Sequence, residues 1–119
     1  MATNLDALVN YNSNELRAVE FFSGATTNST SPIFKVKRGD KVFHSKITGT
    51  GAVSATVTYY GSGFDDLATG VVLDTHTLSG TTTAAEGSQV AITTAWPYLW
   101  AIITNISGTG AAVTALMVV

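Results

Sequence analysis

Residues 47 to 60 read Ile-Thr-Gly-Thr-Gly-Ala-Val-Ser-Ala-Thr-Val-Thr-Tyr-Tyr, and this stretch decides the fold class. From Val53 onward, apolar residues alternate with Ser, Thr and Tyr, which is the period of a β-strand with one buried face. The Gly-Thr-Gly that precedes this strand supplies the backbone freedom that a turn requires. The stretch therefore predicts a glycine-rich turn that enters a half-buried strand.

A second copy of the pattern lies at residues 106 to 116, which read Ile-Ser-Gly-Thr-Gly-Ala-Ala-Val-Thr-Ala-Leu. It begins 59 residues after the first copy (106 minus 47), which is longer than the roughly 20 to 50 residues of a solenoid repeat. Two interpretations fit. The copies are equivalent corners of a sandwich with internal pseudo-symmetry, or they are the same turn solution used twice.

The rest of the chain shows the same short strands separated by turns. Eight strands are expected, at residues 19–22, 33–37, 42–47, 53–60, 71–78, 89–93, 98–103 and 111–119. Residues 79–87 are rich in Ser, Thr and Gly and are expected to form a loop. Strands at intervals of roughly 8 to 15 residues are typical of a sandwich, not of a parallel sheet with crossover helices. The sequence therefore predicts an all-β protein, an antiparallel β-sandwich with jelly-roll topology.

Residues 1–18 differ in kind from the rest, because Asn residues are scattered there among Leu and Val. We expect an extended or partly ordered N-terminal arm, since terminal segments become ordered only when something holds them. Leu5, Leu8 and Val9 have helical spacing, so a short helix is the alternative. Residues 19–119 have the usual length of one domain and are predicted to form a single β-sandwich domain.

Charge is scarce and unevenly distributed. Charged residues make up 12% of the chain, and none of the 73 residues after Lys46 (119 minus 46) is Lys or Arg. A free domain normally covers its surface with mixed charge, so this surface fits a packed assembly or a medium in which charge matters little. Uncharged β edges also invite pairing with other chains. We therefore expect a homo-oligomer, a dimer or a trimer, with strands from residues 47–119 at the interface.

Several functional classes are excluded or disfavoured. The net charge is −2, so nucleic acid is not an expected partner. Cysteine is absent, which excludes a disulfide framework and a thiolate metal site. The first ten residues lack the basic start and apolar core of a secretion signal, and no apolar run approaches the ~18 residues of a membrane span. We expect a protein that is synthesised in the cytoplasm of its host and does not associate with membrane.

Five of the six cations lie close together in the sequence. They are Lys35, Lys37, Arg38, Lys41 and Lys46. A hairpin that placed them on one face would form a positive patch able to dock on an acidic protein surface. The alternatives are a solvated strand face and, less expected, a phosphate site.

Reactive or metal-binding patterns are not indicated. His44 and His76 have no recognisable ligand spacing. The chain has no nucleophile elbow and no phosphate-binding loop that opens a helix. Asp65 and Asp66 follow a glycine-rich turn, where Asp commonly closes the backbone onto itself. We therefore expect no enzyme activity, no cofactor and no metal.

One aromatic group offers a different possibility. Trp96 and Tyr98 flank Pro97 at the entry to a strand, and exposed aromatic rings on a β-sandwich can bind sugar rings. They are the candidate sugar contacts. Trp100 lies in an apolar alternation and is expected in the core, in a strand that is covered on both sides.

Four segments carry a resemblance to a known group of proteins. They are residues 34–40, 47–62, 95–98 and 106–114. Together they resemble small virion proteins of tailed bacteriophages, in the style of capsid decoration or cement proteins, over residues 33–119. In that group a strand ending in Arg-Gly-Asp leads to a Gly-Thr-Gly strand, and an aromatic Pro-Tyr strand precedes a closing Gly-Thr-Gly-Ala strand. Many relatives carry an Asp-Gly-x-Trp turn where this chain has Gly63-Phe-Asp-Asp66.

The resemblance implies a structural role. Decoration proteins are jelly-roll or β-sandwich domains that sit as oligomers on the outer surface of the capsid and bridge subunits of the major capsid protein. It implies a trimer in preference to a dimer. If the acidic surface on which the five cations dock is that of the capsid, they are candidate capsid contacts; the resemblance itself carries over no functional residue beyond the turns. The alternative is a carbohydrate- or receptor-binding β-sandwich module of a phage fibre or tail.

Overall fold

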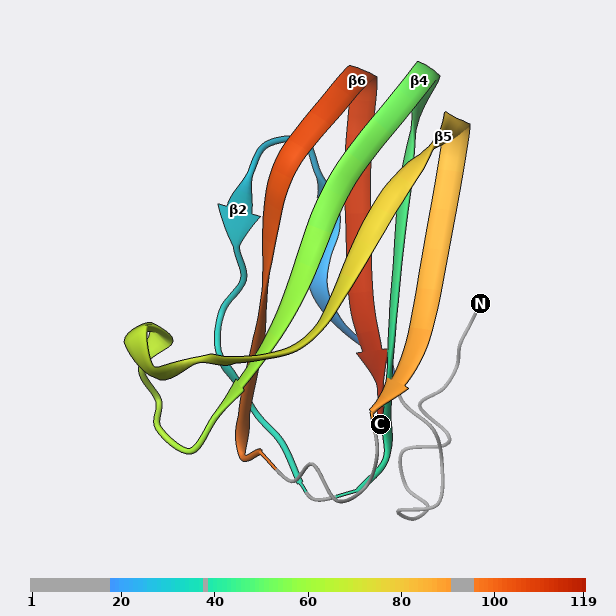
Figure 1. The fold of residues 1–119 in the computed structure, drawn as a ribbon. Helices are drawn as coiled ribbons and strands as arrows, with labels where there is room; N and C mark the ends of the chain where they lie inside the picture. The colour runs from blue at the N-terminus through green and yellow to red at the C-terminus, as the bar shows by residue number, and fades with distance from the viewer. Residues whose placement is uncertain (1–17, 38, 91–95) are drawn as a thin grey trace.

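The computed structural model describes residues 18–37, 39–90 and 96–119, and they form almost entirely β structure (Figure 1). The strands are β1 (Ala18–Ala25), β2 (Ser29–Thr30), β3 (Phe34–Lys35), β4 (Lys41–Ser62), β5 (Val71–Val90) and β6 (Tyr98–Val118), with one short 3-10 helix, η1 (Leu67–Thr69). No helix in this part of the chain is long and apolar enough to span a membrane. The expected N-terminal arm, apart from Ala18, lies outside the described residues.

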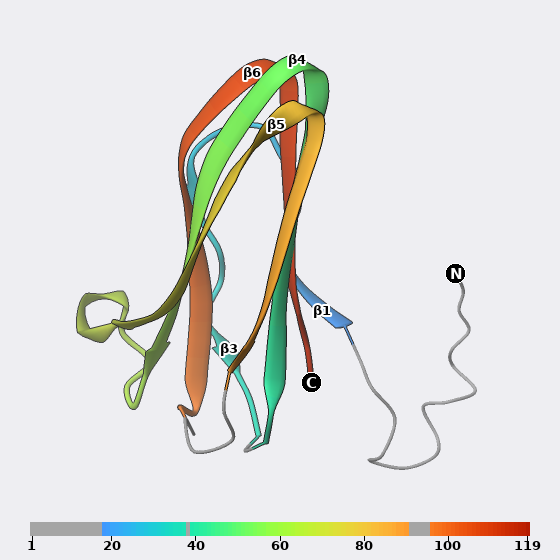
Figure 2. The same cartoon turned by 45° about the vertical axis from the view of Figure 1, so that its right-hand side comes forward.

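Three of the strands are long and fold over at their middle. β4, β5 and β6 contain 22, 20 and 21 residues, against a usual strand length of about 5 to 6. Figures 1 and 2 show all three arching over at the same end of the molecule, so that each runs through both layers. The rings of Phe43 and Tyr59, in opposite halves of β4, stack with centroids 4.2 Å apart. One antiparallel sheet therefore folds into a two-layer sandwich.

The Gly-Thr-Gly copies form the crest of this fold. Thr50 in β4 is paired with Thr109 in β6, and the register shifts on either side of this pair. Gly51 and Gly110 have φ values of 72° and 66°, in the left-handed region that favours glycine. Such bulges sharpen the twist and bend a strand. The two copies are therefore neighbouring corners of one crest, an arrangement that is compatible with both interpretations of the repeat.

The strand pairing has jelly-roll order when each half of a bent strand is counted separately. The first layer runs β1, second half of β6, first half of β4, second half of β5. The second layer runs β2 with β3, first half of β6, second half of β4, first half of β5. Count β1 as segment 1, β2 with β3 as segment 2, and the two halves of β4, β5 and β6 as segments 3 to 8 in chain order. The layers then have the orders 1-8-3-6 and 2-7-4-5, which is the jelly-roll topology. The predicted all-β fold class is confirmed.

The expected loop at residues 79–87 is wrong, because β5 continues through it. Ser79 to Ser88 pair with β4 on both sides of the crest, for example Ala84 with Ile47. This pairing with a distant strand overrides a local composition that favours a turn. Of the short strand expected at 89–93, residues 89 and 90 belong to β5 and the others lie outside the described residues.

The core lies between the two layers and is supplied by alternate residues of the long strands. In β4, Phe43, Ile47, Val53, Val57 and Tyr59 are buried, while their neighbours point outward. On both sides of the crest the same face of the strand is turned inside, whereas residues 48–52 at the crest itself are not buried. An exposed residue that alternates with these buried residues therefore lies on the outer face of the layer to which its half of the strand belongs.

Candidate interaction surfaces

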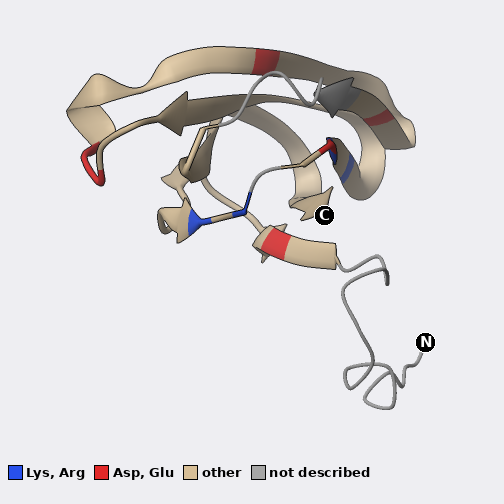
Figure 3. Ribbon diagram, turned by 90° about the horizontal axis from the view of Figure 1, so that it is seen from below, with Lys and Arg blue, Asp and Glu red and all other residues tan. Residues whose placement is uncertain are grey.

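The structure does not bring the five predicted cations onto one face. Lys35 is the Cα partner of Tyr98, and its neighbour Phe34 packs inward against Phe21 with centroids 5.4 Å apart. Lys35 therefore points out from the second layer. Lys46 lies between the buried residues Ser45 and Ile47 and points out from the first layer. Figure 3 shows the lysine segments in separate places.

Lys41 is buried and belongs to the structure of a turn. Only 4% of its surface is exposed, and its Nζ donates to the carbonyl oxygens of Lys37 at 2.7 Å and Gly39 at 2.9 Å. Burial lowers the pKa of the Lys41 ammonium, against the opposing effect of Asp40. Arg38 lies outside the described residues. Exposed members of the predicted cluster are therefore Lys35, Lys37 and Lys46.

Trp96 and Tyr98 do not form a common sugar-binding platform. The Trp96 ring lies against Gly61, where an added Cβ would come within 2.7 Å of the ring, and it packs on the core. Tyr98 is half-buried and lies on the outer face of the second layer, beside Lys35. The sequence-predicted pair therefore divides between the interior and the surface.

Trp100 is buried as expected, but on the outer face of the second layer. It stacks on Tyr60 with centroids 5.8 Å apart, and Gly70 covers it so closely that a Cβ there would meet the ring at 2.5 Å. The segment between β4 and β5, residues 63–70, therefore packs over this face. We call this segment the acidic loop, because it contains Asp65 and Asp66.

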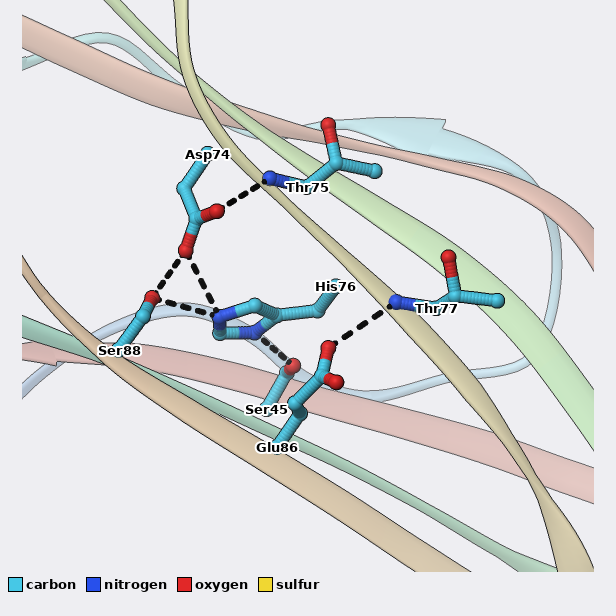
Figure 4. Close-up of polar contacts among 7 residues, drawn as sticks. All are labelled: Ser45, Asp74, Thr75, His76, Thr77, Glu86 and Ser88. Atoms are coloured by element: carbon cyan, nitrogen blue, oxygen red, sulfur yellow. Dashed lines mark hydrogen bonds and ion pairs between the residues drawn. The ribbon is translucent and has the colours of Figure 1, made fainter.

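A chain of polar side chains closes the open side of the sandwich, where β5 is the edge strand of both layers (Figure 4). Ser45 Oγ lies 2.6 Å from His76 Nδ1, and Ser88 Oγ lies 2.8 Å from His76 Nε2. Ser88 also donates to the Asp74 carboxylate, so the hydroxyl of Ser88 accepts the Nε2 proton and Ser45 donates to Nδ1. Each of these four side chains therefore has a hydrogen-bond partner. We call these four residues the polar seam.

The polar seam contains the residue types of a hydrolase triad but not its arrangement. Ser45 and His76 are each only 1% exposed, so a substrate cannot reach the hydroxyl. In the triad the nucleophile contacts Nε2 and the carboxylate contacts Nδ1, whereas here Asp74 Oδ2 lies 3.3 Å from Nε2. The neighbouring Tyr59 hydroxyl is buried without a hydrogen-bond partner among the described residues, and burial raises its pKa. The seam is therefore a structural closure.

The edge of β5 is also protected against pairing with another chain. Asp74 and Glu86 are at inward positions in its two halves, and Glu86 Oε1 accepts from the backbone N–H of Thr77 at 3.2 Å. Inward-pointing charges and bent edges are devices that prevent edge-to-edge association. Of the strands in residues 47–119, β4 and β6 have partners on both sides. An interface through strand pairing at β5 is therefore disfavoured.

The acidic loop is built from its own hydrogen bonds. Ser62 Oγ lies 2.7 Å from Thr69 Oγ1 and accepts from the backbone N–H of Phe64 at 3.0 Å. Asp66 caps η1, since its Oδ1 accepts from Ala68 N at 2.9 Å. The prediction that Asp in this turn closes the backbone onto itself is confirmed at Asp66. The loop is thus a defined structure and presents its side chains in fixed positions.

Exposed apolar side chains lie in this loop and at the start of β5, and we call them the apolar patch. Phe64, Leu67, Val71 and Val72 are 67%, 51%, 47% and 54% exposed, and they are four of the six large apolar side chains that are exposed in the described part of the chain. Sequence reasoning missed this patch. The available signal was that Phe64 and Leu67 flank two aspartates in a glycine-rich turn, where apolar residues have no core to fill.

Comparison with known proteins identifies the fold. No protein-family model matches the sequence, and no curated protein matches it. Among solved structures, the SPBc2 prophage-derived protein YomS is similar with a TM-score of 0.55, at 17% identity over 88% of this chain and 94% of that one. The VP2 subviral particle of infectious bursal disease virus gives a TM-score of 0.50, at 10% identity over 99% of this chain and 37% of that one. At these identities the likeness establishes the fold alone.

Proposed function

We propose that this protein is a structural protein of a phage particle, namely a capsid decoration or cement protein. The observation that carries the proposal is the jelly roll whose surface has almost no charge beyond Lys46, a composition suited to packing against neighbours. The likeness in fold to a prophage-derived protein and to a viral particle protein supports it. No reactive group in the described residues lies in an accessible cleft that would favour an enzyme.

The proposed work is mechanical. A protein on the outer surface of the capsid that contacts several subunits of the major capsid protein adds buried area across their junctions. A standard interface buries about 1,200 to 2,000 Å², and many copies multiply the effect. Stabilisation then comes from the number of contacts, so the protein needs no catalytic group and no cofactor.

The outer face of the first layer is the proposed capsid contact. Val42, His44 and Lys46 are exposed and alternate along the first half of β4. This face is separate from the acidic loop and from Lys35, which lie on the second layer. Among the described residues this face carries Lys46 and, on β1, Glu20, which pairs with Leu116 beside His44. In this proposal Lys46 meets an acidic position on the capsid.

The proposal is tested by adding the purified protein to particles of a phage whose genome lacks the gene for this protein. We expect binding and increased survival of the particles on heating. Lys46→Glu should reduce occupancy at least about fivefold, because the charge at the proposed contact is reversed. Thr75→Glu, which adds charge to the exposed surface of β5 on the second layer, should bind like the unchanged protein. Particles that neither contain nor rebind the protein would refute the proposal.

A further inference from the structure

We propose that the acidic loop and its apolar patch dock on the Lys35 and Lys37 surface of a second copy of this chain. The inference deepens the homo-oligomeric part of the proposed function by naming the contact. It rests on three features of the structure: a concentrated apolar patch, a rigid loop that displays it, and complementary charge on the same layer.

The first feature is where the exposed apolar side chains lie. Phe64, Leu67, Val71 and Val72 all fall within nine residues of sequence (64 to 72). Val72 pairs with Tyr60 and so points to the outer face of the second layer, whereas Val71 pairs with Gly61 and points to the opposite face. Exposed apolar surface rimmed by polar groups marks an interaction site, and here Phe64, Leu67 and Val72 supply it. Phe is also among the residue types enriched at protein interfaces. The patch therefore requires a partner with apolar surface of its own.

The second feature is the rigidity of the loop. The contacts of Ser62 with Thr69 and of Asp66 with Ala68 hold the turn from within, and Gly70 seats it on the Trp100 ring. A side chain already held in its bound position loses less conformational entropy on association. Phe64 and Leu67 are therefore displayed as preorganised contact residues.

The third feature is charge. The rim of the patch carries Asp65 and Asp66, and the sequence holds no cation from residue 47 to the end. The partner must therefore supply cations, and this chain has them at Lys35 and Lys37, both exposed. Lys35 lies beside the half-buried ring of Tyr98, which offers apolar surface next to the positive charge. Charge complementarity of this kind fixes the orientation of two partners.

Both halves of the proposed contact lie on the second layer. The acidic loop covers its outer face over Trp100, and Lys35 points out from the same layer at β3. Two copies related by a two-fold axis can therefore make the contact twice, as an isologous interface requires. This geometry favours a dimer over the trimer that the sequence resemblance implies, and it leaves the Lys46 face of the first layer free for the capsid.

The test is the oligomeric state of the purified full chain in sedimentation experiments over a range of concentration. We expect a stable dimer whose association weakens with added salt. The double variants Phe64→Ser with Leu67→Ser and Lys35→Glu with Lys37→Glu should each raise the dimer dissociation constant at least about tenfold. Circular dichroism melting of each variant verifies that it remains folded. Matched controls on the first layer, Val42→Ser and Lys46→Glu, should leave the dimer unchanged.

A charge exchange makes the test specific. Asp65→Lys alone should weaken the dimer, and its combination with Lys35→Glu should restore association, because opposite charges again face each other. A monomeric unchanged protein, or an oligomer that none of these substitutions weakens, would overturn the inference. A dimer that fails to bind particles would instead refute the proposed function and leave the contact standing. The two ideas therefore fail separately.

Discussion

Gly108→Ala is expected to lower the free energy of unfolding by about 3 kcal/mol or more, as measured by denaturant unfolding at a fixed protein concentration. Gly108 has a φ of 123°, and a Cβ there would lie 2.7 Å from the carbonyl oxygen of Ala52 and 2.9 Å from Val53 Cγ1. Backbone strain costs roughly 1 to 3 kcal/mol, and overpacking costs a similar amount. Because β4 and β6 are paired at the crest, neither strand can shift by itself to make room for the added Cβ.

The matched control is Gly110→Ala, two residues further along the same crest. Gly110 has a φ of 66°, but an added Cβ would meet no atom within 4 Å. Only the left-handed backbone then contributes, about 1 to 2 kcal/mol. If both substitutions cost the same, the close approach of β6 to β4 at the crest is not what requires glycine there.

Phe43→Ala is expected to cost about 3 to 5 kcal/mol, the range for truncation of a buried phenylalanine. The Phe43 side chain is fully buried. Its ring stacks on Tyr59 at a centroid distance of 4.2 Å and lies 6.3 Å from Phe21. The substitution removes the contact that holds the two halves of β4 against each other, so thermal unfolding should shift strongly to lower temperature.

Val42→Ala, the adjacent residue, is the control for this effect. Val42 points outward from the first layer and is 39% exposed, so its truncation should change stability by no more than about 0.5 kcal/mol. A large loss at Val42 together with a small loss at Phe43 would mean that the register of β4, and with it the inward face of the sandwich, is reversed.

Local sequence patterns predicted most of the fold. The alternation of apolar and polar residues at 53–60 can be recognised in the sequence alone, and Val53, Val57 and Tyr59 are buried as it predicts. The Gly-Thr-Gly copies were identifiable as corners. What they could not reveal is that the strand continues through each corner, because that depends on pairing between Thr50 and Thr109.

The interaction surfaces were less predictable, because each depends on contacts between distant segments. The sequence predicted Lys41 to be a surface cation, but its ammonium is bound by the carbonyl oxygens of Lys37 and Gly39 in the turn. Lys35 and Lys46 are close in sequence, yet they occupy opposite layers, since the chain passes from one layer to the other between them. The sequence shows how many charged residues there are, but not on which layer of the sandwich each of them lies.

The exposed apolar side chains of the acidic loop likewise depend on a contact between distant segments. Phe64 and Leu67 follow a strand whose Tyr59 and Gly61 are buried, and apolar residues next to a strand are normally assigned to the core. The two aspartates between them indicated a turn, and the placement of Gly70 on Trp100 adds that the loop folds back over the outer face, with Phe64 exposed.

An electron-microscopy map of the purified phage particle tests the central proposal most directly. We expect density for two-layer jelly rolls on the outer surface of the head, each in contact with more than one subunit of the major capsid protein. The first layer should face the capsid, and the acidic loop should lie at a contact between copies. A map that shows no such domain on the head, or that places it only on a fibre or tail, would refute a role as a capsid decoration protein.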